Sequence, residues 1–439
     1  MNYNFYHIYP LGLTGAPERN DLHSEPVSRI RELESWIDHI KEGGFNAVYF
    51  GPLFESESHG YDTVDYYRID RRLGTNEDFA YLCGKLKENG LAVFVDGVFN
   101  HVARSFRAFR DLEEKRGDSS FRDWFKDVSI DPFHVRCWEG HESLVELNLT
   151  NSSVREHIFG AVEMWFRQFG IDGLRLDVAY CLHMDFLQDL RNFTRGLDRD
   201  FQLLGEVIHG DYRQWLDRDL LDSVTNYECY KGIYSSLNDN NFYEIAYSLN
   251  RLFGEDGIYR NYSLYNFIDN HDVNRIASVL KHPGHFYNAL IALYTIPGNP
   301  SVYYGSEWGL EGIKEGHSDR NLRPALRCQD HPSEEREIAA WEAVRKLASI
   351  RNASPSLRKG SYRELYKDSN QMAFAREEGD ELTVCALNSS QNEVRISIPV
   401  PRDGAYRDLL NDETLWAEKG VLHLRIWPNW GAVLRFSNS

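Results

Sequence analysis

Carboxylates at the ends of short apolar runs are the residues of this chain best suited to chemistry. Asp96 lies near the end of one such run, Asp177 and Glu206 end two others, and Asp272 follows a fourth. A single acidic residue in such a place is usually a helix cap or a surface charge. Several that converge on one site would carry a large cost in desolvation and repulsion unless the site used them. We therefore take these four as parts of a candidate active site.

Two of these carboxylates have sequence neighbours that predict different pKa values. Arg175 and Asp177 are two residues apart on one predicted strand, so both side chains point to one face and the guanidinium should keep Asp177 ionised. Glu206 lies between Leu204 and Val207, apolar neighbours that should raise the pKa of its carboxyl group. A low-pKa nucleophile beside a high-pKa acid is the arrangement of a retaining glycosidase. The alternative is a structural ion-pair network around Arg175.

Other kinds of active site have less support in the sequence. A metal-dependent barrel hydrolase would need a His-x-His pair on its first strand, where only His7 is present. The sequence has no Gly-x-Ser-x-Gly elbow and no Walker loop. None of the six cysteines has an adjacent base or the spacing of a zinc site, so we expect reduced core thiols.

The elements that must position these residues alternate between strand and helix. Short β-branched and aromatic runs are separated by amphipathic stretches, among them 27–42, 76–89, 153–169 and 184–196. This alternation predicts a closed parallel (β/α)8 TIM barrel, in which functional residues gather at the carboxyl ends of the strands. An open doubly wound sheet is the alternative, but no glycine-rich phosphate turn follows the first strand. The eight predicted strands are 5–9, 47–50, 91–98, 173–178, 202–207, 224–227, 265–268 and 301–304.

Two regions depart from this alternation. Residues 102–149 follow the third strand, are rich in Arg, Asp, Phe and Trp, and show no clear period, which predicts a loop excursion that walls a cleft. The last part of the chain has period-two apolar runs between Gly, Asn and Asp turns, which predicts a C-terminal antiparallel β-sandwich. The predicted domains are the catalytic barrel (1–101 and 150–353), the excursion (102–149) and the β-sandwich (354–439).

Composition narrows the range of partners. The 439 residues carry 67 Asp and Glu against 49 Lys and Arg, and the net charge of -18 disfavours nucleic acid and anionic membranes. The aromatic fraction of 13% supplies many flat faces on which a sugar could stack. The N-terminus lacks a signal-peptide pattern and no apolar run is long enough to cross a membrane, so we expect a cytoplasmic protein.

Four ordered blocks resemble the α-amylase family of glycoside hydrolases. The resemblance spans nearly the whole barrel and implies a (β/α)8 fold that hydrolyses α-glucans with retention of anomeric configuration. The blocks are Asp96-Gly-Val-Phe-Asn-His101, Gly173-Leu-Arg-Leu-Asp177-Val-Ala, Gly205-Glu-Val207 and Phe267-Ile-Asp-Asn-His-Asp272.

The resemblance also implies a role for each site residue. Asp177 would be the nucleophile and Glu206 the acid/base, while Asp272 would orient sugar hydroxyls and stabilise the oxocarbenium-like transition state. The implied substrate-binding residues are Tyr61 as a stacking platform, His101 and His271 as hydrogen-bonding partners of the same sugar, Arg175 as the group that orients Asp177, Asp319 and Arg323 as a pair that grips the next glucose, and Asp96. Trp138, Tyr230 and Trp308 are candidates for the leaving-group side.

Within the family, the chain is most similar to the cyclomaltodextrinase, neopullulanase and maltogenic amylase group, on stretches such as 121–125, 205–209 and 222–227. That group usually has an N-terminal β-domain that builds its dimer. Here the first strand starts by Phe5, so we expect no such domain and a monomer or weak oligomer. Many secreted amylases bind calcium through a Lys-His step after the nucleophile. Because Val-Ala-Tyr follows Asp177, we expect no required metal or organic cofactor, although Asn100 and the acidic loop could bind calcium.

The expected function is therefore a retaining hydrolase of α-1,4 bonds in maltooligosaccharides, with cyclodextrins and pullulan as further substrates and some transglycosylation. Two alternatives stay open at this point. The first is an exo-acting α-glucosidase or oligo-1,6-glucosidase. The second is a sugar-binding barrel that has no catalytic activity.

Overall fold

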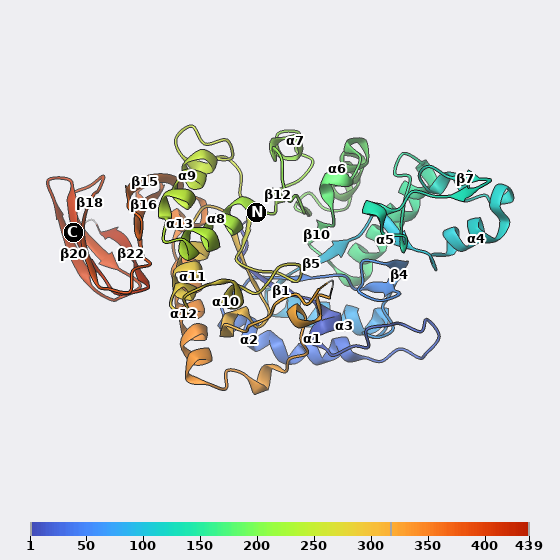
Figure 1. Cartoon of the computed structure of the whole chain (residues 1–439), viewed down its shortest axis with the longest axis horizontal. Helices are drawn as coiled ribbons and strands as arrows, with labels where there is room; N and C mark the ends of the chain where they lie inside the picture. The colour runs from blue at the N-terminus through green and yellow to red at the C-terminus, as the bar shows by residue number, and fades with distance from the viewer. Residues whose placement is uncertain (1, 317, 438–439) are drawn as a thin grey trace.

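The structure is a computed structural model that describes residues 2–316 and 318–437, so the outermost residues of the first and last predicted domains lie outside the described part. The long axis of the molecule runs from the C-terminal sheet, at the left of Figure 1, through the barrel to the excursion at the right.

Eight parallel strands form a closed barrel. They are hydrogen-bonded in the order β12-β11-β10-β5-β2-β1-β14-β13, and a parallel bridge between Thr225 and Tyr265 joins the two ends of this order. The predicted TIM barrel is confirmed, and each predicted strand overlaps an observed one. The barrel strands are β1 (Phe5–Ile8), β2 (Ala47–Phe50), β5 (Ala92–Gly97), β10 (Gly173–Leu176), β11 (Gln202–Gly205), β12 (Ser223–Val224), β13 (Tyr265–Phe267) and β14 (Asn299–Tyr303).

The helices around the barrel begin and end close to the predicted residues. Helix α3 (Asn76–Glu88) starts at a reciprocal capping box between Thr75 and Asp78, and α5 (Ser152–Phe169) ends at Gly170, which adopts a left-handed conformation. None of the described helices combines the length and the apolar composition needed to cross a bilayer. The other helices are α1 (Pro10–Leu13), α2 (Ile37–Glu42), α6 (Met184–Leu197), α7 (Arg213–Leu216), α8 (Tyr227–Asn238), α9 (Phe242–Phe253), α10 (Ile276–Val279), α11 (His285–Thr295), α12 (Glu335–Asn352) and α13 (Pro355–Lys359).

The predicted helix 27–42 differs from expectation in its first half. It begins as a 3₁₀ helix, η1 (Arg29–Trp36), and becomes α-helical only in α2. The buried residues of η1 are Ile30, Leu33 and Trp36. Their spacing of three matches the three-residue turn of a 3₁₀ helix, which places all three on one face toward the core.

The excursion after β5 is held closed at its base. Strand β6 (His101–Ala103) at its start pairs antiparallel with β9 (Leu144–Glu146) at its end, and a short hairpin, β7 (Ser129–Ile130) with β8 (Phe133–His134), lies between them. The sequence shows no clear period in this region, yet part of it forms a helix, α4 (Arg107–Lys115). This helix buries Ala108, Phe109 and Leu112. A nine-residue helix with three buried residues is too short to give a clear apolar repeat.

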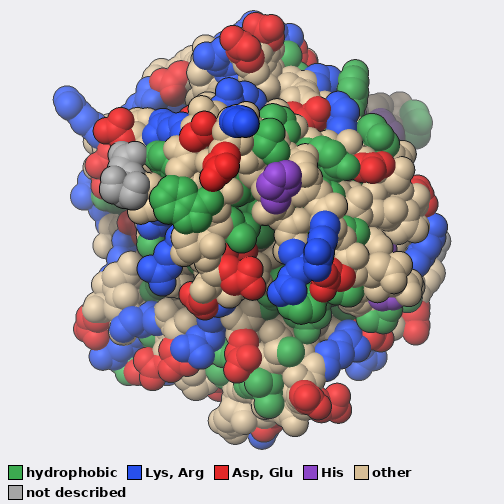
Figure 2. Space-filling view, turned by 90° about the vertical axis from the view of Figure 1, so that its left-hand side faces the viewer, with side chains coloured by type: hydrophobic (Ala, Val, Ile, Leu, Met, Phe, Trp, Pro, Cys, Tyr) green, Lys and Arg blue, Asp and Glu red, His purple; other side chains and the backbone are tan. Residues whose placement is uncertain are grey.

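The C-terminal region is one antiparallel sheet in the order β15-β16-β17-β22-β19-β20-β21-β18. Ala373 of β16 and Ile398 of β18 lie near opposite ends of this order but share one apolar core, so the sheet curls around it. On the face seen in Figure 2, acidic and basic side chains are mixed with small hydrophobic patches. The strands are β15 (Ser361–Lys367), β16 (Gln371–Glu378), β17 (Glu381–Asn388), β18 (Val394–Pro399), β19 (Gly404–Asp408), β20 (Thr414–Glu418), β21 (Val421–Ile426) and β22 (Trp430–Ser437).

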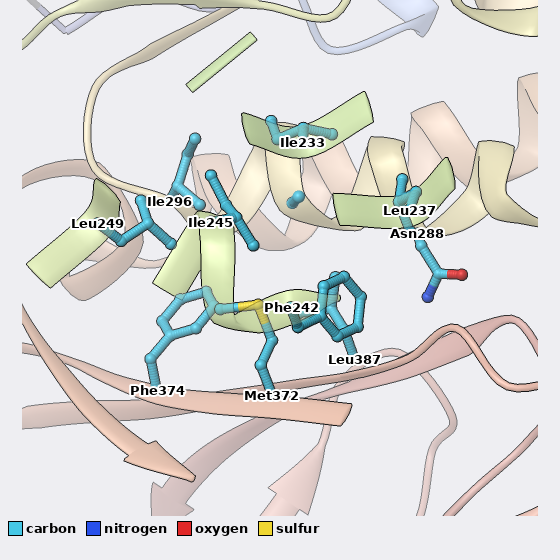
Figure 3. Close-up of a pocket in the computed structure, with 11 residues that line it drawn as sticks. Ile233, Leu237, Phe242, Ile245, Leu249, Asn288, Ile296, Met372, Phe374 and Leu387 are labelled. Atoms are coloured by element: carbon cyan, nitrogen blue, oxygen red, sulfur yellow. The ribbon is translucent and has the colours of Figure 1, made fainter. Parts of the chain in front are cut away.

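This sheet packs tightly on the barrel helices. Met372 and Phe374 of β16 face Ile233 of α8 and Ile245 of α9 across a small apolar gap (Figure 3). The gap has a free volume of about 10 Å³, which is room for about one water molecule. It is therefore part of a packed interface between barrel and sheet and too small for a ligand.

Candidate active site

The barrel register brings the predicted carboxylates to one rim. Arg175 of β10 lies directly beside Asp96 of β5 in the parallel pairing. The Asp177 amide donates to the Gly97 carbonyl at 3.1 Å, and the Glu206 amide donates to the Leu176 carbonyl at 2.9 Å. These hydrogen bonds continue the ladder past the strand ends. They fix the backbone of both carboxylates at the carboxyl edge of the barrel, where barrel active sites form.

One guanidinium group binds three of these carboxylates. Arg175 Nη1 lies 2.8 Å from Asp96 Oδ1 and 2.9 Å from Asp177 Oδ1, while Nη2 lies 2.9 Å from Glu206 Oε1. Arg175 is only 4% exposed, and Asp177 and Glu206 are 6% and 5% exposed. Since both carboxylates bind one planar group, they lie side by side at the mouth of the barrel.

The pKa values of the pair differ from the expectation in one respect. Burial raises the pKa of Glu206 despite the opposing charge of Arg175, as predicted. Burial, opposed by Arg175 and reinforced by the charges of Glu206, Asp96 and Asp272, also raises the pKa of Asp177, so the predicted low pKa was wrong. The reason is that burial outweighs the charge of Arg175, which also pairs with Asp96 and Glu206.

Asp272 lies near this pair, since its charge raises the pKa of both carboxyls, and has a different environment. Its Oδ2 lies 2.9 Å from His271 Nε2, and its Oδ1 accepts a hydrogen bond from Arg323 Nη2 at 3.0 Å. Burial acts to raise the pKa of Asp272, but His271 and Arg323 outweigh burial and hold the pKa below its ordinary value. Arg323 Nη2 also lies 3.0 Å from Asp319 Oδ2, so the predicted Asp319–Arg323 pair is adjacent to Asp272.

Tyr61 connects the two groups of carboxylates. It lies in the turn between β3 (Phe54–Ser56) and β4 (Thr63–Ile69), and its hydroxyl donates to Asp96 Oδ2 at 3.0 Å and contacts His271 Nε2. Its ring is stacked on the His271 ring with centroids 5.6 Å apart, and the Arg175 guanidinium lies 5.9 Å from its centroid. A continuous set of contacts therefore runs from Asp272 through His271 and Tyr61 to the Arg175 cluster.

His101 approaches the site from the base of the excursion. Its ring is stacked on Trp138 with centroids 5.2 Å apart, and its buried Nε2 has no hydrogen-bond partner among the described residues. Burial lowers the pKa of His101 to about 3, so the ring is neutral near pH 7. A buried ring nitrogen without a partner is costly unless a ligand or water satisfies it.

The three aromatic candidates for the leaving-group side have different positions. Trp138 stacks on His101 and so lies at the site. Trp308 is 1% exposed and stacks on His331, and Tyr230 stacks on Phe267, so their assignment to the leaving-group side is not supported. Large aromatic side chains are often buried in the core, so the residue type alone does not show which of them contacts substrate.

Two tyrosines of the site were missed by the sequence reasoning. Tyr49 donates to Asp96 Oδ2 at 2.9 Å, and the Tyr9 hydroxyl accepts from Arg323 Nη1 at 3.3 Å. Tyr9 is the last residue of one predicted strand and Tyr49 the last but one of another, but only Asp, Glu, His and Arg were considered at the strand ends. Counting phenol groups at the same positions would have found them.

The described residues form no group of three or more His, Cys, Asp or Glu side chains arranged to hold a metal ion. Asn100 Oδ1 is buried without a hydrogen-bond partner, but a single amide oxygen falls short of the six to eight oxygen ligands that calcium takes. The described residues therefore supply no cluster of three acidic ligands for calcium beside Asn100. The site therefore contains two adjacent carboxyl groups, those of Asp177 and Glu206, and a third near them, that of Asp272.

Comparisons with known proteins agree with this chemistry. The family model for the alpha amylase catalytic domain matches residues 30–384, and that for the alpha amylase C-terminal all-beta domain matches residues 365–424. Neopullulanase 2 of Thermoactinomyces vulgaris is 29% identical over 423 residues, which cover 92% of this chain and 70% of that protein. A cyclomaltodextrinase of Bacillus sp is 30% identical over 416 residues, which cover 88% of this chain and 72% of that protein. The solved structure of the ligand-free cyclic alpha-maltosyl-(1→6)-maltose hydrolase from Arthrobacter globiformis has a TM-score of 0.82 and 26% identity, and the match covers 99% of both chains.

Proposed function

Because this chain belongs to the α-amylase family of glycoside hydrolases, we propose that it cleaves α-1,4-glucosidic bonds of maltooligosaccharides and related maltodextrins with retention of anomeric configuration. The observation that carries the proposal is that Asp177 and Glu206 both form ion pairs with the single guanidinium group of Arg175. Two carboxyl groups held side by side suit a double displacement, in which no water need fit between them in the first step.

The proposed reaction has two steps. Protonated Glu206 gives its proton to the glycosidic oxygen while an Asp177 carboxylate oxygen attacks the anomeric carbon, so the bond to the leaving sugar breaks and a glycosyl ester forms. Glu206, now ionised, then takes a proton from a water molecule that attacks the same carbon and releases Asp177. The raised pKa of Glu206 supports its role as the acid. In this scheme Glu206 carries the proton and Asp177 is ionised when substrate is bound, and the hydrogen bond that Arg175 Nη1 donates to Asp177 Oδ1 at 2.9 Å favours the ionised form.

The other residues of the site are proposed to bind and orient the sugar. Asp272, whose pKa is held low, stays ionised and stabilises positive charge that develops at the anomeric centre. His101 is neutral near pH 7 and has a free ring nitrogen for a sugar hydroxyl. Arg175 and Asp96 hold the catalytic carboxylates in place, while Asp319 and Arg323 lie where a neighbouring glucose would bind beyond Asp272.

A digest of four substrates tests the function. We expect maltoheptaose and β-cyclodextrin to give mainly maltose and short maltooligosaccharides, pullulan to be cleaved at its α-1,4 bonds, and isomaltose to be untouched. Release of single glucose units from chain ends, with cleavage of isomaltose, would favour an exo-acting α-glucosidase instead. If none of the substrates is cleaved, the alternative that remains is a sugar-binding barrel without catalytic activity. Because the described residues form no cluster of three or more possible His, Cys, Asp or Glu metal ligands, we expect the same products after dialysis against EDTA. Loss of activity that Ca²⁺ restores would contradict this.

We further propose that the protein works in a reducing compartment such as the cytoplasm, as a monomer or weak oligomer. All six cysteines are free, and Cys83, Cys229 and Cys385 are buried. Free thiols of this kind are typical of cytosolic proteins. Burial also raises the pKa of Cys229 to about 12, so this thiol is inert.

The raised pKa of Glu206 predicts the shape of the pH profile. Only the protonated carboxyl can act as the acid, so kcat on maltotriose should fall as the pH rises through the pKa of Glu206. In Glu206→Gln, hydrolysis of maltotriose should be lost, but α-maltotriosyl fluoride should still release a burst of fluoride because that leaving group needs no proton. The exposed Glu163→Gln on α5 is the control and should behave as wild type. Loss of the burst in Glu206→Gln would contradict a pure acid/base role.

A further inference from the structure

A concave aromatic surface lies away from the carboxylate cluster, where the barrel meets the C-terminal sheet. It is shallow and open, with a free volume of about 460 Å³, and is lined by Tyr287 of α11, by Trp427 and Pro428 of the β21–β22 turn and by Trp430 at the start of β22. Trp427 is 45% exposed, which is unusual for so large an apolar side chain. Tyr287 and Trp430 are half-buried against the core, but the proposed reaction uses none of these rings.

The aromatic surface is held rigid by buried amide side chains. Trp430 Nε1 donates to Asn411 Oδ1 at 2.8 Å, and its ring meets Tyr287 edge to face with centroids 5.5 Å apart. Asn388 Nδ2 donates to the Trp427 carbonyl at 3.0 Å, and Asn288 Nδ2 of α11 donates to the Trp430 carbonyl at 3.2 Å. Rings fixed in this way lose little conformational entropy when a ligand covers them, which favours binding.

The chemistry of the lining selects a neutral, hydroxylated ligand. The residues that line the surface include no acidic and no basic side chain. The polar groups of the lining are the Asn429 amide and the Tyr287 hydroxyl. The Arg425 guanidinium lies 4.5 Å from the centroid of the Trp427 ring, where it stacks on one face of that ring. Flat apolar rings beside these uncharged polar groups match the apolar faces and hydroxyl edges of glucose units.

A single segment of the chain leads from the active site to the aromatic surface. The segment that leaves β13 carries His271 and Asp272 and then reaches Gly284, at the start of α11. In a (β/α)8 barrel such a segment lies on the same face as the active site. A Cβ at position 284 would lie 2.8 Å from Asn429 Nδ2, so glycine there lets α11 approach the β21–β22 turn closely.

We propose that Tyr287, Trp427 and Trp430 form a second carbohydrate-binding site, which holds a linear α-1,4-glucan chain on the surface of the enzyme. The identity of the ligand rests on the function proposed above. The second site would retain long chains near the barrel mouth, so its effect is expected on polysaccharides and not on short oligosaccharides.

Native electrophoresis in gels that contain soluble starch tests this site. Acarbose is added to saturation so that the active site is occupied, and the mobility of the wild-type enzyme should still be reduced by starch. In Trp427→Ala the apparent dissociation constant should rise about ten-fold, as expected for loss of a tryptophan at the centre of a binding surface. Trp416→Ala is the matched control, because Trp416 is a 61% exposed tryptophan on β20 of the same sheet. The kcat/KM for maltotriose should be unchanged in both variants.

Three outcomes would overturn the proposal: wild-type mobility that starch does not affect, retardation that acarbose abolishes, and equal retardation of Trp427→Ala and wild type. The last result would also fit a surface that binds another protein. Failure of the proposed function gives a different pattern, in which starch retards the wild type but no glucan is hydrolysed.

Discussion

Replacing Asp177 with asparagine is expected to lower kcat for maltotriose hydrolysis by about four to six orders of magnitude, since nucleophile and acid act as one unit. Asparagine has the same shape and its Oδ1 can still accept the hydrogen bond from Arg175 Nη1, which is 2.9 Å long in the native site. The fold should therefore be preserved, with a melting temperature close to that of the wild type. Steady-state kinetics on maltotriose and a thermal melt measure the two quantities.

The control for this variant is Asp185→Asn on α6, an exposed aspartate whose loss should leave turnover unchanged. A direct test of the covalent step uses a 5-fluoro-glucosyl fluoride, which forms a slowly hydrolysed ester with a nucleophilic carboxylate. Peptide mass spectrometry should find the label on Asp177. A label on Glu206 or Asp272, or turnover by Asp177→Asn within ten-fold of wild type, would show that the roles have been assigned wrongly.

Replacing Arg175 with leucine is expected to have the largest effect on stability. The variant would leave Asp96, Asp177 and Glu206 buried without the cation that all three contact. Breaking a buried ion pair by removing one partner costs about 3–5 kcal/mol, because the remaining charge is uncompensated. Hydrolysis of maltotriose should also fall sharply, since the two catalytic carboxylates lose their common support. Urea denaturation at pH 7 measures the free energy of unfolding.

The pH dependence of this loss distinguishes electrostatics from lost packing. Without Arg175, the pKa values of Asp177 and Glu206 rise further above those of the unfolded chain, so the charged forms destabilise the fold at pH 7. As the pH falls toward the pKa values of the folded state, the carboxyls become neutral and the difference in stability from the wild type should narrow. Arg167→Leu, which removes a surface pair with Glu163, is the control and should change stability by less than about 1 kcal/mol. A loss for Arg175→Leu that is the same at pH 5 and pH 8 would contradict the electrostatic explanation.

Patterns local in the chain were enough to predict the barrel and the four carboxylates of its site. Period and apolar composition indicated eight strands, and strand ends indicated Asp96, Asp177, Glu206 and Asp272, because the carboxyl ends of parallel strands must meet at one rim. The apolar neighbours of Glu206 correctly predicted its raised pKa. The neighbours of Glu206 in sequence allowed this prediction because an apolar strand is expected to be buried in the folded protein.

The properties that depend on distant groups could not be predicted in this way. The pKa of Asp177 depends on its burial and on a guanidinium group that also pairs with two other carboxylates. The register of the barrel strands determines which carboxylates lie beside that group. Tyr49 joins the site by contact with Asp96, 47 residues away. The aromatic surface unites α11 with a turn about 140 residues later in the chain. The energies of ion pairs and stacked rings depend on the distance between the groups, so they depend on which residues folding brings together. Strand and helix periodicity can instead be recognised from residues that are close in sequence.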